Sequence, residues 1–150
     1  LPRPLLHRPD CDFSFSGLKT AVRKHILACN PDGQLSDHDK NDIAASFQAA
    51  VSDILDRKVG RAMDLTRDAL GKNPRLVIAG GVAANQALRT RLTETAHERG
   101  FTLDVPPASL CTDNGALIAW AGLEHLQIGE RSTMELDARA RWPLDKTTTR

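Results

Sequence analysis

The sequence predicts an α/β fold in which helices alternate with short strands, and two observations carry this prediction. The apolar run at residues 76–79 is typical of a buried parallel strand, and it leads through two glycines into a helical pattern that begins near Asn85. That pattern ends at Gly100, and residues 101–105 follow as a second strand-like run. Because strand, helix and strand follow one another closely, residues 76–105 are predicted to form a right-handed βαβ unit with parallel strands.

A short strand and a helix are expected before this unit, near the start of the chain. Phe13 and Phe15 alternate with serines, as side chains do along a strand. A helical face follows from about Gly17, and the Asn-Pro-Asp-Gly sequence at 30–33 ends it. The polar stretch from there to about Lys40 is predicted to be a connection.

A long helix is predicted to join this connection to the βαβ unit. Ser36, with Asp39 three residues later, is a start signal of the capping type. An apolar stripe then continues from Ile43 to Leu70, before an Asn-Pro pair stops it. We expect Gly60 to bend or divide this helix.

A last helix is predicted over about residues 114–127, and Gly129 is a suitable residue to end it. Residues 130–150 are predicted to be an extended tail. The chain contains no internal repeat, and at this length we expect residues 1–150 to form a single domain.

The glycine pair after residues 76–79 is a candidate ligand-binding loop. Gly80 and Gly81 place no Cβ between the main chain and an approaching ligand, and the helix that follows directs unpaired N–H groups toward the same place. A tight strand-to-helix turn with a purely structural purpose explains the same residues. The pair therefore predicts a ligand loop only in combination with other motifs.

A second polar cluster precedes the last helix. Thr112 and Asp113 carry side-chain oxygens of the kind that cap helices. On these residues alone, capping is the simpler interpretation.

The composition excludes several function classes. With 41% hydrophobic residues the chain can bury a core of ordinary size, and a formal net charge of +1 gives no general attraction to nucleic acid or to anionic membranes. Three cysteines leave one unpaired thiol and have no metal-binding spacing. No apolar run approaches the ~20 residues that a membrane span requires, and no secretory signal is visible. We therefore expect a cytoplasmic protein without membrane contacts.

Four motifs occur in order along the chain, at residues 12–20, 42–48, 80–89 and 111–115. They read Asp-Phe-Ser-Phe-Ser-Gly-Leu-Lys-Thr, Asp-Ile-Ala-Ala-Ser-Phe-Gln, Gly-Gly-Val-Ala-Ala-Asn followed by Leu-Arg, and Cys-Thr-Asp-Asn-Gly. Together they resemble the C-terminal half of the TsaD/Gcp family, the bacterial tRNA threonylcarbamoyladenosine transferases once labelled O-sialoglycoprotein endopeptidases. The resemblance covers nearly the whole chain, from about residue 4 to about residue 145.

The resemblance implies the C-terminal lobe of an actin-like, sugar-kinase-like ATPase fold, the ribonuclease H-like class also called ASKHA. In such a fold a nucleotide lies in the cleft between two lobes. The family's N-terminal lobe carries a His-x-x-x-His motif that supplies two metal ligands, and no pair of histidines here has that spacing. Since the sequence also begins at Leu1, we expect one lobe of a two-lobe enzyme, with the N-terminal lobe absent. The histidines are His7, His25, His38, His97 and His125.

The resemblance also implies roles for individual residues. Asn85 is expected to contact a nucleotide or threonylcarbamoyl-AMP, with Gly80 and Gly81 allowing close approach. Asp113 is expected to complete a site for one divalent metal, iron or else zinc, together with the two histidines of the other lobe. The nucleophile and the leaving group both belong to substrates, so no catalytic side chain is assigned.

The implied reaction moves the threonylcarbamoyl group from threonylcarbamoyl-AMP to the N6 amino group of the adenosine 3′ of the anticodon, in tRNAs that read codons beginning with A. The expected partners are the missing N-terminal lobe, TsaB-like and TsaE-like pathway proteins and tRNA, and the isolated piece is expected to be inactive and prone to self-association. One alternative is a catalytically silent assembly or binding module of the same fold. The other is a metallopeptidase, for which the chain shows no His-Glu-x-x-His motif.

Overall fold

The computed structural model describes residues 1–112 and 114–135 of the chain. It separates into two compact units, residues 1–113 and residues 114–150. The first unit contains all the elements up to the polar cluster before the last helix, and the second contains that helix. The prediction of one 150-residue lobe stays a prediction, and most of the predicted tail at 130–150 lies outside the described residues.

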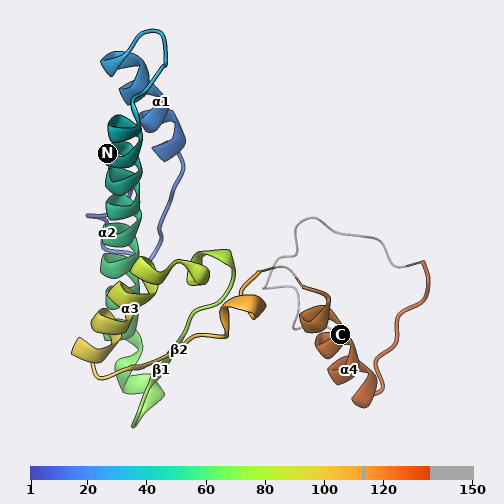
Figure 1. Cartoon of the computed structure of the whole chain (residues 1–150). Helices are drawn as coiled ribbons and strands as arrows, with labels where there is room; N and C mark the ends of the chain where they lie inside the picture. The colour runs from blue at the N-terminus through green and yellow to red at the C-terminus, as the bar shows by residue number, and fades with distance from the viewer. Residues whose placement is uncertain (113, 136–150) are drawn as a thin grey trace. The chain divides into compact units, whose positions relative to one another are not determined.

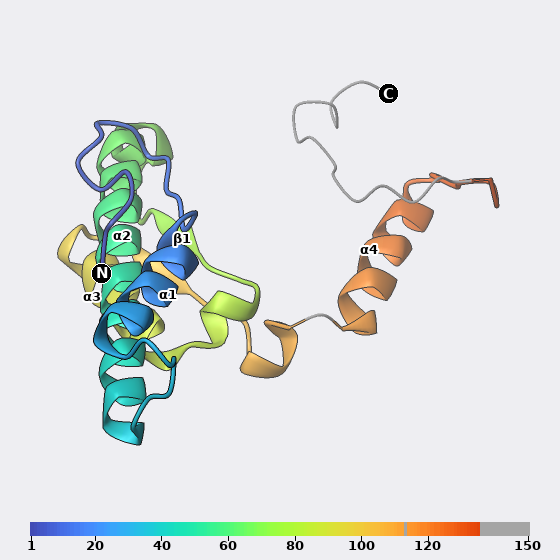
Figure 2. The ribbon, with the colours of Figure 1, turned by 90° about the horizontal axis from the view of Figure 1, so that it is seen from above.

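The first unit is built around the long helix α2, Asp37–Leu70, with the helix α1, Leu18–Cys29, beside it. Figures 1 and 2 show α1 and α3 lying against α2. The predicted start signal of α2 is confirmed, because the Ser36 hydroxyl oxygen accepts a hydrogen bond from the Asp39 backbone N–H at 3.1 Å. The same hydroxyl donates to the Asp39 carboxylate at 2.6 Å, which lowers the pKa of Asp39.

The predicted βαβ unit is present, and its strands are parallel. Strand β1, Arg75–Val77, pairs with β2, Thr102–Asp104, and helix α3, Gln86–Glu98, connects them. Arg75 lies opposite Thr102 in this register. Gly100 ends α3 as predicted: its φ of +69° favours glycine, and the next residue's N–H reaches back to the Ala96 carbonyl at 2.8 Å.

Two expectations for the first unit are wrong. Residues 12–15, with Phe13 and Phe15, form no strand, because β1 and β2 pair only with each other within the described part of the chain. Gly60 does not divide α2, which runs unbroken through it. A Cβ there would come within 2.8 Å of the Arg99 guanidinium, so a glycine at position 60 allows the Arg99 side chain to pack closely against α2.

The core of the first unit lies between α2 and the elements on either side of it. Leu55 packs with Leu88 and Leu92 of α3, while Ile54 packs with Leu18 of α1. These apolar contacts fix the start of α3 against the middle of α2, which is the arrangement on which the candidate site depends.

A buried lysine attaches the segment before α1 to α2. Lys58 is 1% exposed, and its ammonium donates to the carbonyls of Arg8 and Asp10 and to the Asp10 carboxylate, at 3.0–3.1 Å. The hydrogen bond from Lys58 lowers the pKa of Asp10. Burying an ammonium group without hydrogen-bond partners would cost several kcal/mol of folding free energy. The partners of Lys58 in residues 8–10 are therefore held against α2.

The second unit contains helix α4, Gly115–Gln127, which buries none of its side chains in the described residues. Trp120 is 67% exposed. Ile118 and Ile128 are more than 70% exposed. No helix in the described ranges is long and apolar enough to cross a membrane.

The apolar surface of α4 leads to a prediction about the isolated chain. Purified alone, these 150 residues are expected to self-associate, because exposed apolar patches of more than a few hundred Å² tend to find partners. Light scattering over a concentration series measures the self-association, and the fluorescence of a dye that binds apolar surface measures how much of that surface is exposed. Ile118→Glu should weaken the association, whereas the same change at the exposed Leu65 of α2 should not. A strict monomer that binds no dye would contradict the expectation.

Candidate functional site

The glycine pair predicted as a ligand loop lies between β1 and α3, and its two members differ. Gly80 has φ +82° and ψ 178°, a conformation open in practice only to glycine. Gly81 has no such constraint, and a Cβ at either position would meet no atom within 4 Å. The backbone conformation therefore explains why residue 80 is a glycine. At both positions a ligand could approach the main chain without meeting a side chain.

A short turn that the sequence did not predict separates the glycines from α3. Residues Gly81–Ala84 form a 3-10 helix, η1, in which the Ala83 N–H donates to the Gly80 carbonyl at 3.0 Å. The Arg89 guanidinium donates to the Ala83 carbonyl at 2.9 and 3.2 Å and holds this turn against α3. The turn places Asn85, rather than a glycine, at the start of α3.

Asn85 is the N-cap of α3 and also contacts α2. Its side-chain oxygen accepts from the Leu88 backbone N–H at 3.2 Å, and its amide nitrogen donates to the Gln48 side-chain oxygen at 3.1 Å. The Asn85 side chain thus caps α3, and its amide nitrogen still has one N–H that these two bonds do not use. Capping and ligand binding use different atoms of the same side chain, so they are compatible.

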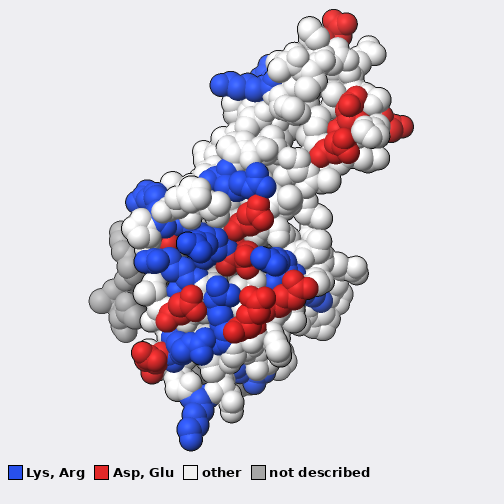
Figure 3. All heavy atoms as spheres, turned by 90° about the vertical axis from the view of Figure 1, so that its left-hand side faces the viewer, with Lys and Arg blue, Asp and Glu red and all other residues white. Residues whose placement is uncertain are grey.

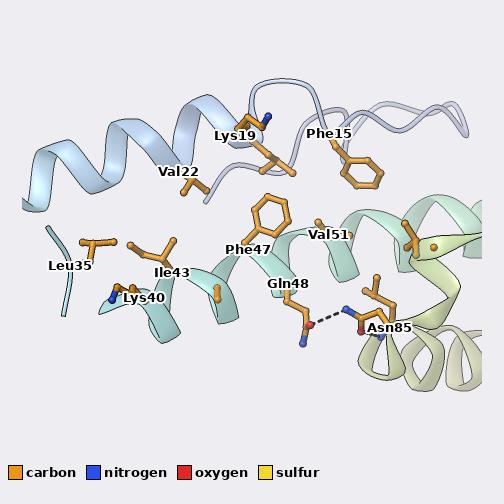
Figure 4. A pocket seen from close by; sticks show the side chains of 15 residues that line it. Phe15, Lys19, Val22, Leu35, Lys40, Ile43, Phe47, Gln48, Val51 and Asn85 are labelled. Carbon is orange, nitrogen blue, oxygen red and sulfur yellow. Dashed lines mark hydrogen bonds between the residues drawn. The ribbon is translucent and has the colours of Figure 1, made fainter. Parts of the chain in front are cut away.

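An apolar groove of about 930 Å³ adjoins Asn85. Figure 4 shows the side chains of Val22 and Phe47 between α1 and α2, while Gln48 points toward Asn85. The groove's volume falls within the ~300–1,000 Å³ typical of small-molecule sites. Its lining residues are Phe15, Leu18, Lys19, Val22, Leu35, Lys40, Ile43, Ala44, Phe47, Gln48, Val51, Gly81, Val82, Asn85 and Leu88.

The structure brings together three of the four predicted site residues. Gly80, Gly81 and Asn85 lie within one turn, and Gly81 and Asn85 line the groove together with Gln48. Gln48 was not predicted as a site residue. The motif that contains Gln48 was noticed only as part of the family resemblance. A single glutamine on a long helix carries no sequence signal that separates a functional side chain from an ordinary solvent-exposed one.

The fourth residue, Asp113, lies outside the described residues. The N-cap of α4 is Asn114, whose side-chain oxygen accepts from the Leu117 N–H at 3.0 Å. The N-cap of α4 is thus a residue that the capping alternative did not name, and the role of Asp113 stays a prediction. Within residues 1–112 and 114–135, no group of three His, Cys, Asp or Glu side chains could hold a metal ion, so these residues do not by themselves fit one.

Several charges on the first unit are paired across its elements. Arg91 of α3 lies 2.8 Å from Asp56 of α2, and Arg75 lies 2.6 Å from Asp104 across the β1–β2 pair, which lowers the pKa of Asp104. On the face shown in Figure 3, basic and acidic side chains are interspersed. This face offers no surface of one sign for a polyanion.

Comparisons with known proteins show the family to which the chain belongs. A family model described as TsaD, tRNA N6-adenosine threonylcarbamoyltransferase, matches residues 1–120. The chain belongs to the TsaD family, and this membership implies the ASKHA fold.

Curated relatives of the same description are similar over nearly the whole chain. The protein of Paracoccus denitrificans is 54% identical over 149 residues, covering 97% of this chain and 40% of the relative. Those of Rhodospirillum rubrum and Rhodopseudomonas palustris are each 52% identical, covering 97% and 99% of this chain and 40% of the relative. The chain thus spans about 40% of the length of the curated relatives that it matches.

Proposed function

We propose that the chain is the C-terminal lobe of a transferase that moves a threonylcarbamoyl group from threonylcarbamoyl-AMP to the N6 amino group of the adenosine 3′ of the anticodon in tRNA. The observation that carries the proposal is the family match over residues 1–120, with relatives of that description about half identical to this chain. The whole enzyme includes a second lobe, which supplies the other wall of the nucleotide cleft.

In this proposal, the turn between β1 and α3 binds the nucleotide. Two features support it: the exposed main chain at Gly80 and Gly81, with open space where a side chain would stand, and the remaining amide N–H of Asn85. A nucleotide offers phosphate and ribose oxygens as acceptors for that N–H, and the apolar groove beside it suits a planar base. The role of this chain's residues is to bind and orient the nucleotide.

Asp113 is proposed as one ligand of a divalent metal, iron or else zinc, on the basis of its carboxylate chemistry and its place in the fourth motif. The remaining ligands are proposed to come from the other lobe. TsaB-like and TsaE-like proteins and tRNA are the proposed partners, and the cytoplasm is the proposed location.

A substitution at Asn85 tests the nucleotide role. In the full-length protein, Asn85→Ala is expected to weaken ATP binding by about 1–3 kcal/mol, the cost of removing one partner of a buried hydrogen bond. The same change removes the cap of α3 and is expected to lower stability by about 1 kcal/mol. Calorimetric titration and thermal unfolding measure the two effects separately.

A second variant separates binding from capping. Asn85→Asp keeps the capping oxygen but replaces the donor nitrogen with an acceptor, so affinity should fall while stability is maintained. Asn41→Ala, at an exposed position early in α2, is the control. Unchanged affinity in both Asn85 variants would leave Asn85 as a helix cap only.

A further inference from the structure

We propose that Gln48 is a positioning residue that fixes the side-chain amide of Asn85 and thereby directs its remaining N–H at the ligand. This inference rests on the proposed nucleotide role of Asn85. It adds a residue of α2 to a site that the sequence placed wholly on the glycine turn and the start of α3.

The first step concerns the orientation of the Asn85 amide. Its oxygen is committed to the Leu88 N–H, since a helix cap must present an acceptor. The Asn85 nitrogen must then face Gln48, and the 3.1 Å contact requires Gln48 to present its oxygen. The cap of α3 therefore determines the orientation of both amides.

The second step concerns what the pair presents to a ligand. Each of the two side-chain oxygens already accepts one hydrogen bond inside the chain, while one N–H of Asn85 and the two N–H groups of Gln48 are not used by these bonds. The pair therefore presents three N–H donors. These donors suit an acceptor-rich ligand such as a nucleotide, with its phosphate and ribose oxygens.

The third step concerns rigidity. Gln48 and Asn85 are 37 residues apart in sequence, on two elements that the core locks together through Leu55 and Leu88. A side-chain amide held only at its oxygen can still rotate and swing, whereas one held at both ends has its free N–H aimed in one direction. Figure 4 shows the bond that supplies the second point of attachment.

A double-mutant cycle in the full-length protein tests this, with ATP as the probe and calorimetry as the measurement. Gln48→Leu removes the acceptor, and its affinity for ATP is expected to fall about fivefold, the effect of one ordinary hydrogen bond. Because the pair lies at the surface, the thermal stability should change little. Gln86→Leu is the matched control, as this exposed side chain at the start of α3 makes no hydrogen bond within the described residues.

The cycle distinguishes the two proposals. If Gln48 acts through Asn85, the double variant Gln48→Leu with Asn85→Ala binds ATP no more weakly than Asn85→Ala alone. Additive losses, or a loss with Asn85→Ala but none with Gln48→Leu, overturn the positioning role. Unchanged affinity in Asn85→Ala instead overturns the nucleotide role on which it rests.

Discussion

A preparation of these 150 residues alone is expected to form no threonylcarbamoyladenosine. The chain spans about 40% of the length of its relatives, and within the described residues no three side chains come together that could hold a metal ion. In the proposed function, the glycine turn and Asn85 supply only one wall of a nucleotide site, and catalysis requires both reactants to be held in register. We therefore expect the loss of activity to be complete rather than partial.

The assay combines the purified chain with tRNA, preformed threonylcarbamoyl-AMP and the TsaB-like and TsaE-like proteins, followed by mass analysis of the tRNA nucleosides. A full-length protein that contains the same residues is the positive control. Circular dichroism of the purified chain must show helix, so that inactivity is not due to unfolding. Turnover by the 150 residues alone would contradict the proposal that they are one lobe of the enzyme.

Local sequence signals predicted the helices and their ends well. Ser36 starts α2 and Gly100 ends α3, because a capping hydroxyl and a left-handed glycine act on the few residues beside them. The parallel pairing of β1 with β2 was also predicted, since a strand-helix-strand sequence of this length leaves few other arrangements.

Features that depend on distant residues were not predictable in the same way. Phe13 and Phe15 have the alternation of a strand, but a strand also needs a partner. Gly60 resembles a helix breaker until Arg99, 39 residues later in the sequence, is seen packed over it. Gln48 becomes significant only when the fold brings Asn85 to it.

The candidate site shows the same division between local and distant information. Gly80 was predicted because a glycine places no Cβ in the way of a ligand, and Asn85 was predicted from the family resemblance of its motif. Neither observation shows that one N–H of the Asn85 amide remains available for a ligand. That conclusion required the observed bonds at both ends of the amide.

Asp113→Asn in the full-length protein is expected to cause the largest loss from a single substitution. A neutral amide lacks the negative charge that helps a carboxylate hold a divalent cation, so most of the bound metal should be lost. Activity is expected to fall by about 100-fold or more, in line with the several kcal/mol that a metal ion contributes to such reactions. Elemental analysis of the purified protein and the nucleoside assay measure these two effects.

Stability should hardly change, and this separates a metal ligand from a helix cap. The cap of α4 is supplied by Asn114, and asparagine caps a helix as well as aspartate does, so Asp113→Asn should leave thermal unfolding almost unchanged. Asp68→Asn, at an exposed position near the end of α2, controls for the loss of one negative charge. If the full-length Asp113→Asn protein keeps its metal and its activity, the carboxylate is not a ligand, and the metal must be held by other residues.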